Sequence, residues 1–216
     1  MVERPRPSLV ETVIAHTYGR RVPSSVSWRA FADESFVEAA TGGFYVLAAV
    51  VFEHGTHQAV REAMLGLRGT RGSHKLHWNE MDSKQKRTAA KVVADLDGFH
   101  IVAIGSPVPA RRQERAHAAC LTRLVHELHG YAVSELWMEA RTDVLNMRDI
   151  DTVRGARYGL PKGAVLRVEH IDGKDEPVFW AADIVAGAIR THREGRAEYR
   201  ALLADCVYEI DVATDC

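Results

Sequence analysis

Residues 27–35 read SWRAFADES, a short run of small and apolar residues that ends on two adjacent acids. The pattern predicts a buried strand. Successive side chains of a strand point to opposite faces, so Phe31 and Asp33 are expected on one face and Glu34 on the other. A carboxylate at the end of a buried strand is costly to desolvate unless a cation or a proton compensates its charge. Asp33 therefore either caps the next turn or belongs to a charged site.

A second strand is predicted at residues 44–52, where the run FYVLAAVVF is rich in β-branched and aromatic side chains. Such a run is typical of a strand that is buried on both faces. The two glycines at 42–43 separate it from the first strand, so the two strands are expected to form a hairpin.

Downstream of the hairpin, strands and helices alternate. Strands are predicted at 99–104, 133–139, 165–171 and, late in the chain, 207–210; helices are predicted at 54–67, 83–96, 110–129, in part of 141–160, and from 176 or 177 onward. Asp82 and Gln85 have the spacing of a capping box, and Gly130 is expected to end the long helix. This pattern predicts an α/β domain with a mixed sheet of about five strands flanked by helices.

The composition fits a single domain over residues 25–216 that follows an N-terminal arm at 1–24. The longest apolar stretch, 44–52, is far below the ~20 residues that a membrane-spanning helix needs. No apolar signal-peptide core is expected at the N-terminus, and three widely spaced cysteines favour a reduced, cytoplasmic compartment. The net charge of −1 gives no support for nucleic-acid binding by charge alone.

Three acids lie at positions where a charge is costly to desolvate: Asp33 and Glu139 at strand ends, and Asp183 inside the apolar last helix. Ligands of open α/β sheets collect beyond the carboxyl ends of strands, and clustered carboxylates need protons or cations between them. Mg²⁺ and Mn²⁺ prefer such oxygen ligands, and two ions about 4 Å apart suit phosphodiester hydrolysis. Structural alternatives remain, because Asp183 could pair with Arg190 or Arg141 and Glu139 could be a surface partner.

The order of three short motifs resembles the family called domain of unknown function 3800. The motifs are ADES at 32–35, KLHWNE at 75–80 and ADIVAG at 182–187. The resemblance covers about residues 27–190 and implies a ribonuclease H-like (retroviral integrase-like) fold. It implies that Asp33, Glu139 and Asp183 stand at the family's three acid positions, and Asp172 resembles an acid that often precedes the last helix.

The chain also departs from the family pattern. Phe36 stands where the family has glycine, and Trp180 stands where it has glutamine. Glu139 replaces the more usual aspartate on the fourth strand, so Asp143 is an alternative acid for that position.

Together, the acids and the resemblance predict a metal-dependent nuclease or phosphodiesterase that hydrolyses RNA or DNA, with RNA slightly favoured. Asp33, Glu139 and Asp183 are the predicted ligands of one or two Mg²⁺ or Mn²⁺ ions, and Glu80 is a predicted fourth catalytic acid. The predicted substrate contacts are Lys75, which could instead pair with Glu80, and His77. The alternative is a catalytically inactive nucleic-acid- or protein-binding module of the same fold.

Overall fold

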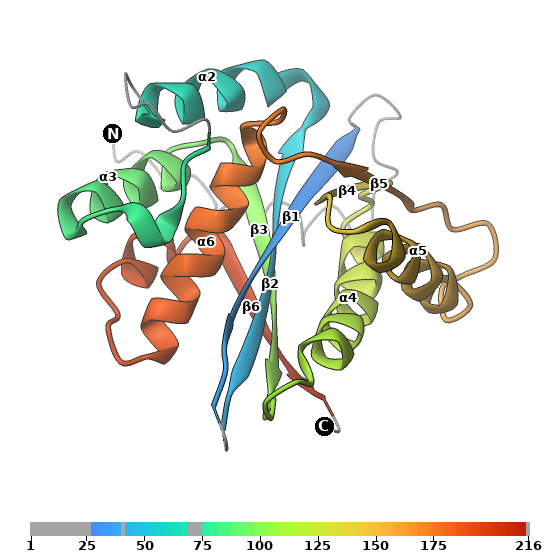
Figure 1. Cartoon of the computed structure of the whole chain (residues 1–216). Coiled ribbons are helices and arrows are strands. Elements are labelled where there is room, and N and C mark those ends of the chain that lie inside the picture. The colour runs from blue at the N-terminus through green and yellow to red at the C-terminus, as the bar shows by residue number, and fades with distance from the viewer. Residues whose placement is uncertain (1–26, 40–41, 69–74, 215–216) are drawn as a thin grey trace, which may run out of the picture.

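The computed structural model of the chain describes residues 27–39, 42–68 and 75–214. These residues form a six-stranded mixed sheet that carries helices on both faces, as Figure 1 shows. The predicted N-terminal arm at 1–24 lies outside the described residues. The prediction of an α/β sheet flanked by helices is confirmed.

The sheet has the strand order β5-β4-β1-β2-β3-β6. Its strands are β1 (Trp28–Val37), β2 (Phe44–Glu53), β3 (Gly98–Ser106), β4 (Glu135–Glu139), β5 (Arg167–Ile171) and β6 (Val207–Ala213). The first three strands are antiparallel neighbours, so the predicted hairpin is confirmed. β4 runs parallel to β1, β5 runs parallel to β4, and β6 runs parallel to β3. The sheet has six strands where about five were expected; the late strand predicted at 207–210 is present, pairs along β3 and extends to residue 213.

The helices come between the later strands. They are α2 (His57–Arg68), α3 (Ser83–Ala94), α4 (Gln113–Gly130), α5 (Asp143–Arg157) and α6 (Val178–Arg193), with one-turn 3-10 helices η1 (His54–Thr56), η2 (Trp78–Glu80) and η3 (Arg200–Leu203). In Figure 1, α2, α3 and α6 lie on one side of the sheet and α4 and α5 lie on the other. None of the described helices is long and apolar enough to cross a membrane.

The side chains of β1 alternate between the two faces of the sheet and belong to two different core clusters. Phe31 belongs to the cluster between the sheet and α6, whereas Ala30 and Ala32 belong to the cluster between the sheet and α4. Burial of each large apolar side chain stabilises the fold by about 1.5–3 kcal/mol. The strand that carries the two acids is therefore fixed from both faces.

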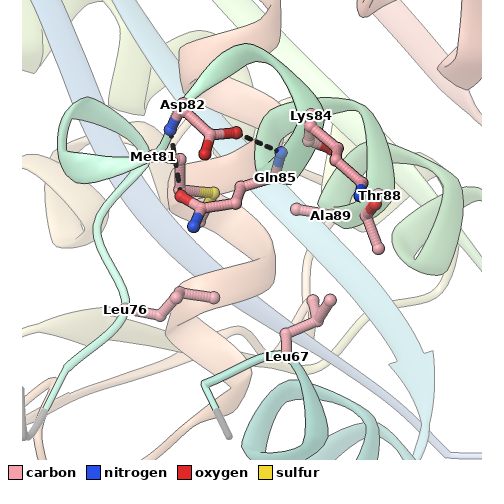
Figure 2. Close-up of a pocket in the computed structure, with 8 residues that line it drawn as sticks. All are labelled: Leu67, Leu76, Met81, Asp82, Lys84, Gln85, Thr88 and Ala89. Carbon is pink, nitrogen blue, oxygen red and sulfur yellow. Dashed lines mark hydrogen bonds between the residues drawn. The ribbon is translucent and has the colours of Figure 1, made fainter. Parts of the chain in front are cut away.

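Two predicted helix ends can be compared with the structure. The capping box of α3 is present: Asp82 Oδ1 accepts from the Gln85 backbone N–H at 2.8 Å, and Gln85 Oε1 accepts from the Asp82 N–H at 3.0 Å (Figure 2). α4 does end at Gly130, but the residue in the left-handed region is Ala132, with φ of 58°. The conformational freedom of Gly130 is therefore not what ends α4.

Candidate active site at the ends of strands β1 and β4

A cavity of about 300 Å³ lies where β4 ends beside β1. Its lining comes from β1, the end of β4, the segment 75–79 and α6; it consists of Ala32, Asp33, Glu34, Lys75, His77, Asn79, Met138, Glu139, Ala140, Arg141 and Asp183. Asp33, Glu139 and Asp183, predicted as one site from positions far apart in the sequence, thus line one cavity. The two residues predicted to contact substrate, Lys75 and His77, line it as well.

Asp33 carries the least compensated charge of the cavity. Burial raises its pKa well above the ordinary value for an aspartate, and the negative charges of Asp183 and Glu139 raise it further. The Lys75 ammonium and a hydrogen bond of 2.8 Å from the Glu34 backbone N–H to Asp33 Oδ1 act in the opposite direction. Because the net shift is upward, Asp33 needs a proton or an additional cation.

The Asp183 carboxylate is hydrogen-bonded by the backbone of Trp78, which packs against α6. Burial raises its pKa, although the Trp78 backbone N–H donates to Asp183 Oδ2 at 2.7 Å and favours the charged form. Trp78 approaches the helix at Gly187, where an added Cβ would lie 2.3 Å from the indole ring. A glycine at this position therefore lets Trp78 close over the helix and bring its N–H to the carboxylate.

The arginines that could have paired with Asp183 have other partners. Arg190 donates to Asn79 Oδ1, and Arg141 binds the carboxylates of Asp149 and Glu114 at 2.6 and 2.8 Å. Among the described residues, the groups that favour the charged form of Asp183 are the Trp78 backbone N–H, Lys75 and His77, and burial outweighs them.

Glu139 and Lys75 form an ion pair inside the cavity. The Glu139 side chain lies directly against Gly173, where an added Cβ would be 2.5 Å from its carboxyl carbon. The positive charge of Lys75 also lowers the pKa of Asp33 and Asp183. Lys75 is thus a cation shared by the three acids.

Three further acids considered from the sequence lie away from this cavity lining. Glu80, a predicted catalytic acid, is exposed at the end of η2. Asp143, the alternative to Glu139, is the exposed first residue of α5, and Asp172 is exposed and pairs with Lys174 at 2.7 Å. The acid that β4 contributes to the cavity is therefore Glu139.

The donor set of the cavity can be compared with the needs of a divalent ion. Within residues 27–39, 42–68 and 75–214, no group of three or more His, Cys, Asp or Glu side chains has an arrangement that could hold a metal ion. The Lys75 ammonium already pairs with Glu139. The chemistry of the donors still fits Mg²⁺ or Mn²⁺, because these are carboxylate oxygens that need further positive charge. A metal ion would require the three side chains to converge around it.

Glu34, next to Asp33, points into a second polar network that the sequence did not reveal. His117 Nδ1 lies 3.4 Å from Glu34 Oε2 and 2.9 Å from the Tyr45 hydroxyl. On its other side, His117 Nε2 lies 2.9 Å from Asp149, whose second oxygen is 3.1 Å from His170 Nε2. The available signal was weak: His117 falls on the apolar stripe of α4, three residues before Cys120.

The charges of this second network compensate one another. Burial lowers the pKa of His117, but the carboxylates of Asp149 and Glu34 outweigh it and raise that pKa to about 9. Burial raises the pKa of Glu34, but His117 and Arg141 outweigh it and leave that pKa below its ordinary value. The pKa values of the two neighbouring acids are thus shifted in opposite directions, down for Glu34 and up for Asp33.

A second cavity, of about 410 Å³, lies between the end of α2 and the start of α3 (Figure 2). Leu67, Leu76 and Met81 contribute apolar side chains to it. Its acid, Asp82, is already engaged in the capping box. The acids with raised pKa values lie in the first cavity, which is therefore the candidate active site.

No protein-family model matches the chain, and no curated protein matches its sequence.

Proposed function

We propose that this chain is a metal-dependent nuclease or phosphodiesterase of the ribonuclease H-like class that hydrolyses RNA or DNA. The observation that carries the proposal is the meeting of Asp33, Glu139 and Asp183 in one cavity, with upward pKa shifts for both aspartates. Nearby carboxylates that disfavour one another's charge are an arrangement that divalent cations stabilise.

The order of the acids along the fold supports the class. The family that the sequence resembles has an acid on the first strand, another on the fourth strand, and a third on the closing helix. Here Asp33 lies on β1, Glu139 ends β4, and Asp183 lies on α6. The antiparallel hairpin and the parallel β1–β4 pair bring the first two acids to the same end of the sheet.

In this mechanism Asp33, Glu139 and Asp183 would hold one or two Mg²⁺ or Mn²⁺ ions. Such ions, when bound, lower the pKa of a water molecule and stabilise the leaving oxygen of the phosphodiester. The chain itself orients two of the acids, because backbone N–H groups of Glu34 and Trp78 donate to Asp33 and Asp183. Lys75 lies beside Glu139, where its ammonium can neutralise a substrate phosphate once a metal ion compensates the acids.

The test is cleavage of labelled single- and double-stranded RNA and DNA in the presence of Mn²⁺. We expect Asp33→Asn and Asp183→Asn to reduce cleavage to the level of an enzyme-free blank, because each removes a charged ligand. Asp151→Asn, which changes an exposed acid of α5, is the matched control and should cleave like the wild type. Wild-type rates in both cavity variants would show that the site is wrong.

A second candidate function is a non-catalytic module that binds nucleic acid or protein. It is favoured by the Lys75–Glu139 ion pair, which supplies positive charge to the acid cluster without a metal. A melting experiment separates the two candidates, since a ligand at 100 times its Kd stabilises the native state by about 2.7 kcal/mol. The nuclease predicts that Mn²⁺ raises the Tm of the wild type but not of Asp33→Asn. An unchanged wild-type Tm supports the binding module.

A further inference from the structure

Three basic side chains from different parts of the chain interact through their charges, and one of them contacts a residue that lines the candidate active site. Lys86 lies on α3, Arg190 on α6, and Arg196 just after α6. Arg190 donates to the side-chain oxygen of Asn79, and Asn79 lines the same cavity as Asp183. Asn79 therefore joins the basic group to the acid cluster.

Trp78 links the two groups in a second way. Its backbone N–H binds Asp183, and the Lys86 ammonium lies 5.2 Å from the centroid of its indole ring. The Trp78 side chain is itself buried, with 1% of its surface exposed, so it supports Lys86 and cannot stack on a nucleic-acid base. This side of the cavity therefore presents positive charge to a ligand.

The three basic side chains act on one another through their charges. Burial lowers the pKa of Lys86, and the positive charges of Arg196 and Arg190 lower it further. One carboxylate, Glu194, opposes this effect and lies 3.7 Å from Arg196. Arg193 is turned to another partner, Asp211, at 2.5 Å. A polyanion that binds such neighbouring cations reduces their mutual repulsion, and its binding releases counterions.

We propose that Lys86, Arg190 and Arg196 form a binding surface for the phosphate backbone of a nucleic-acid strand that extends out of the cavity. The position of the scissile phosphate at the acids rests on the nuclease function proposed above. Arg190 follows Asp183 by seven residues on α6, which is two helical turns or about 10 Å. At ~3.4 Å of axial rise per phosphate, the value for one strand of a B-form duplex, this span corresponds to about three nucleotides; an extended single strand covers it with fewer.

The experiment measures binding of fluorescein-labelled 12-nucleotide single-stranded RNA, and DNA of the same sequence, by anisotropy in EDTA between 50 and 200 mM salt. For single strands, the slope of log K against log[salt] is about −0.7 for each phosphate contact. We therefore expect Lys86→Gln, Arg190→Gln and Arg196→Gln each to make the slope less negative by about 0.7.

Two further variants sharpen the test. Arg115→Gln removes an exposed charge from α4, across the sheet, and should leave the slope unchanged. Glu194→Gln removes the opposing carboxylate and should tighten binding. Because Arg190→Gln also breaks the contact with Asn79, the Lys86 and Arg196 variants provide independent readings that do not disturb the cavity wall.

The outcomes also separate this surface from the nuclease proposal. Unchanged slopes in the three surface variants, or an equal change in Arg115→Gln, would overturn the surface, even if Mn²⁺-dependent cleavage is lost in Asp33→Asn. Slopes that become less negative as expected, with a wild type that cleaves neither oligonucleotide, would support the surface and overturn the nuclease. Less negative slopes in the three surface variants, together with Asp33-dependent cleavage, would support both.

Discussion

Raising the pH from 6.5 to 9 is expected to destabilise the protein by removing the charge that His117 carries in the folded state. The ordinary pKa of a histidine is about 6.5. Burial alone would lower it, but hydrogen bonds to Asp149 and Glu34 raise the pKa of His117 to about 9. The His117 side chain is only 2% exposed, so solvent screens these contacts little. At 1.36 kcal/mol per pKa unit, the raised pKa corresponds to about 3 kcal/mol of stability.

The sign follows from which state holds the proton. Below pH 6.5 both the folded and the unfolded protein carry a charged His117, and the stabilisation is complete. Between pH 6.5 and 9 only the folded state is protonated, so the free energy of unfolding falls by up to about 1.4 kcal/mol per pH unit. Two other shifted histidines, His57 and His100, have pKa values lowered to about 4 and act below this window. Cys206, with its pKa raised to about 11, acts above it.

The assay is urea denaturation at a series of pH values from 6 to 9.5, which gives the free energy of unfolding at each pH. The wild type should lose about 3 kcal/mol across the window, whereas His117→Gln should show a nearly flat profile. His129→Gln, on the same helix, is the control and should follow the wild type. A flat wild-type profile, or the same decline in His117→Gln, would refute the assignment of a charged, buried His117.

Three further outcomes are expected. Asp149→Ala should destabilise the fold by about 3–5 kcal/mol in urea denaturation, because it leaves a buried histidine and arginine without their counter-charge; a cost near zero would argue against the network. Gly173→Ala should reduce Mn²⁺-dependent cleavage with little change in Tm, because its Cβ displaces only the mobile end of Glu139; full activity would speak against a role for that carboxylate. Asp33→Asn should abolish cleavage yet raise the metal-free Tm by removing a repelled charge, whereas Glu34→Gln should lower the Tm and retain activity. Equal loss of cleavage in the last two variants would contradict the separation of the two acids.

Local patterns in the sequence were sufficient for much of the fold. Alternation along β1 predicted the opposite orientations of Asp33 and Glu34, and the apolar run at 44–52 predicted a strand buried on both faces. Both are confirmed, because Glu34 contacts His117 on α4, Asp33 interacts with Asp183 on α6, and residues 45–52 are buried. The capping box of Asp82 and Gln85 is also confirmed, since it depends only on residues three apart. Glu80 shows the limit of motif-based reasoning, because the end of η2 leaves that side chain exposed and outside the cavity lining.

The remaining features depend on contacts between distant segments. Asp149 meets His117 and His170 only because α4, α5 and β5 pack together, and nothing within α5 marks this aspartate as a buried partner. The sixth strand likewise owes its length to its parallel neighbour β3, beyond the four residues whose pattern was visible. Long-range packing of this kind has no short-range signature in one sequence.

The adjacency of the two acids in β1 has a consequence for recognising relatives of this chain. β1 is paired on both sides, with β2 and with β4, so its register is fixed. Inserting one residue just before Asp33 would turn the aspartate toward His117 and the glutamate toward the cavity. What must be preserved is therefore the parity of the spacing. A chain whose two acids are an odd number of residues apart places them on opposite faces of the strand, whereas an even spacing would place both on one face.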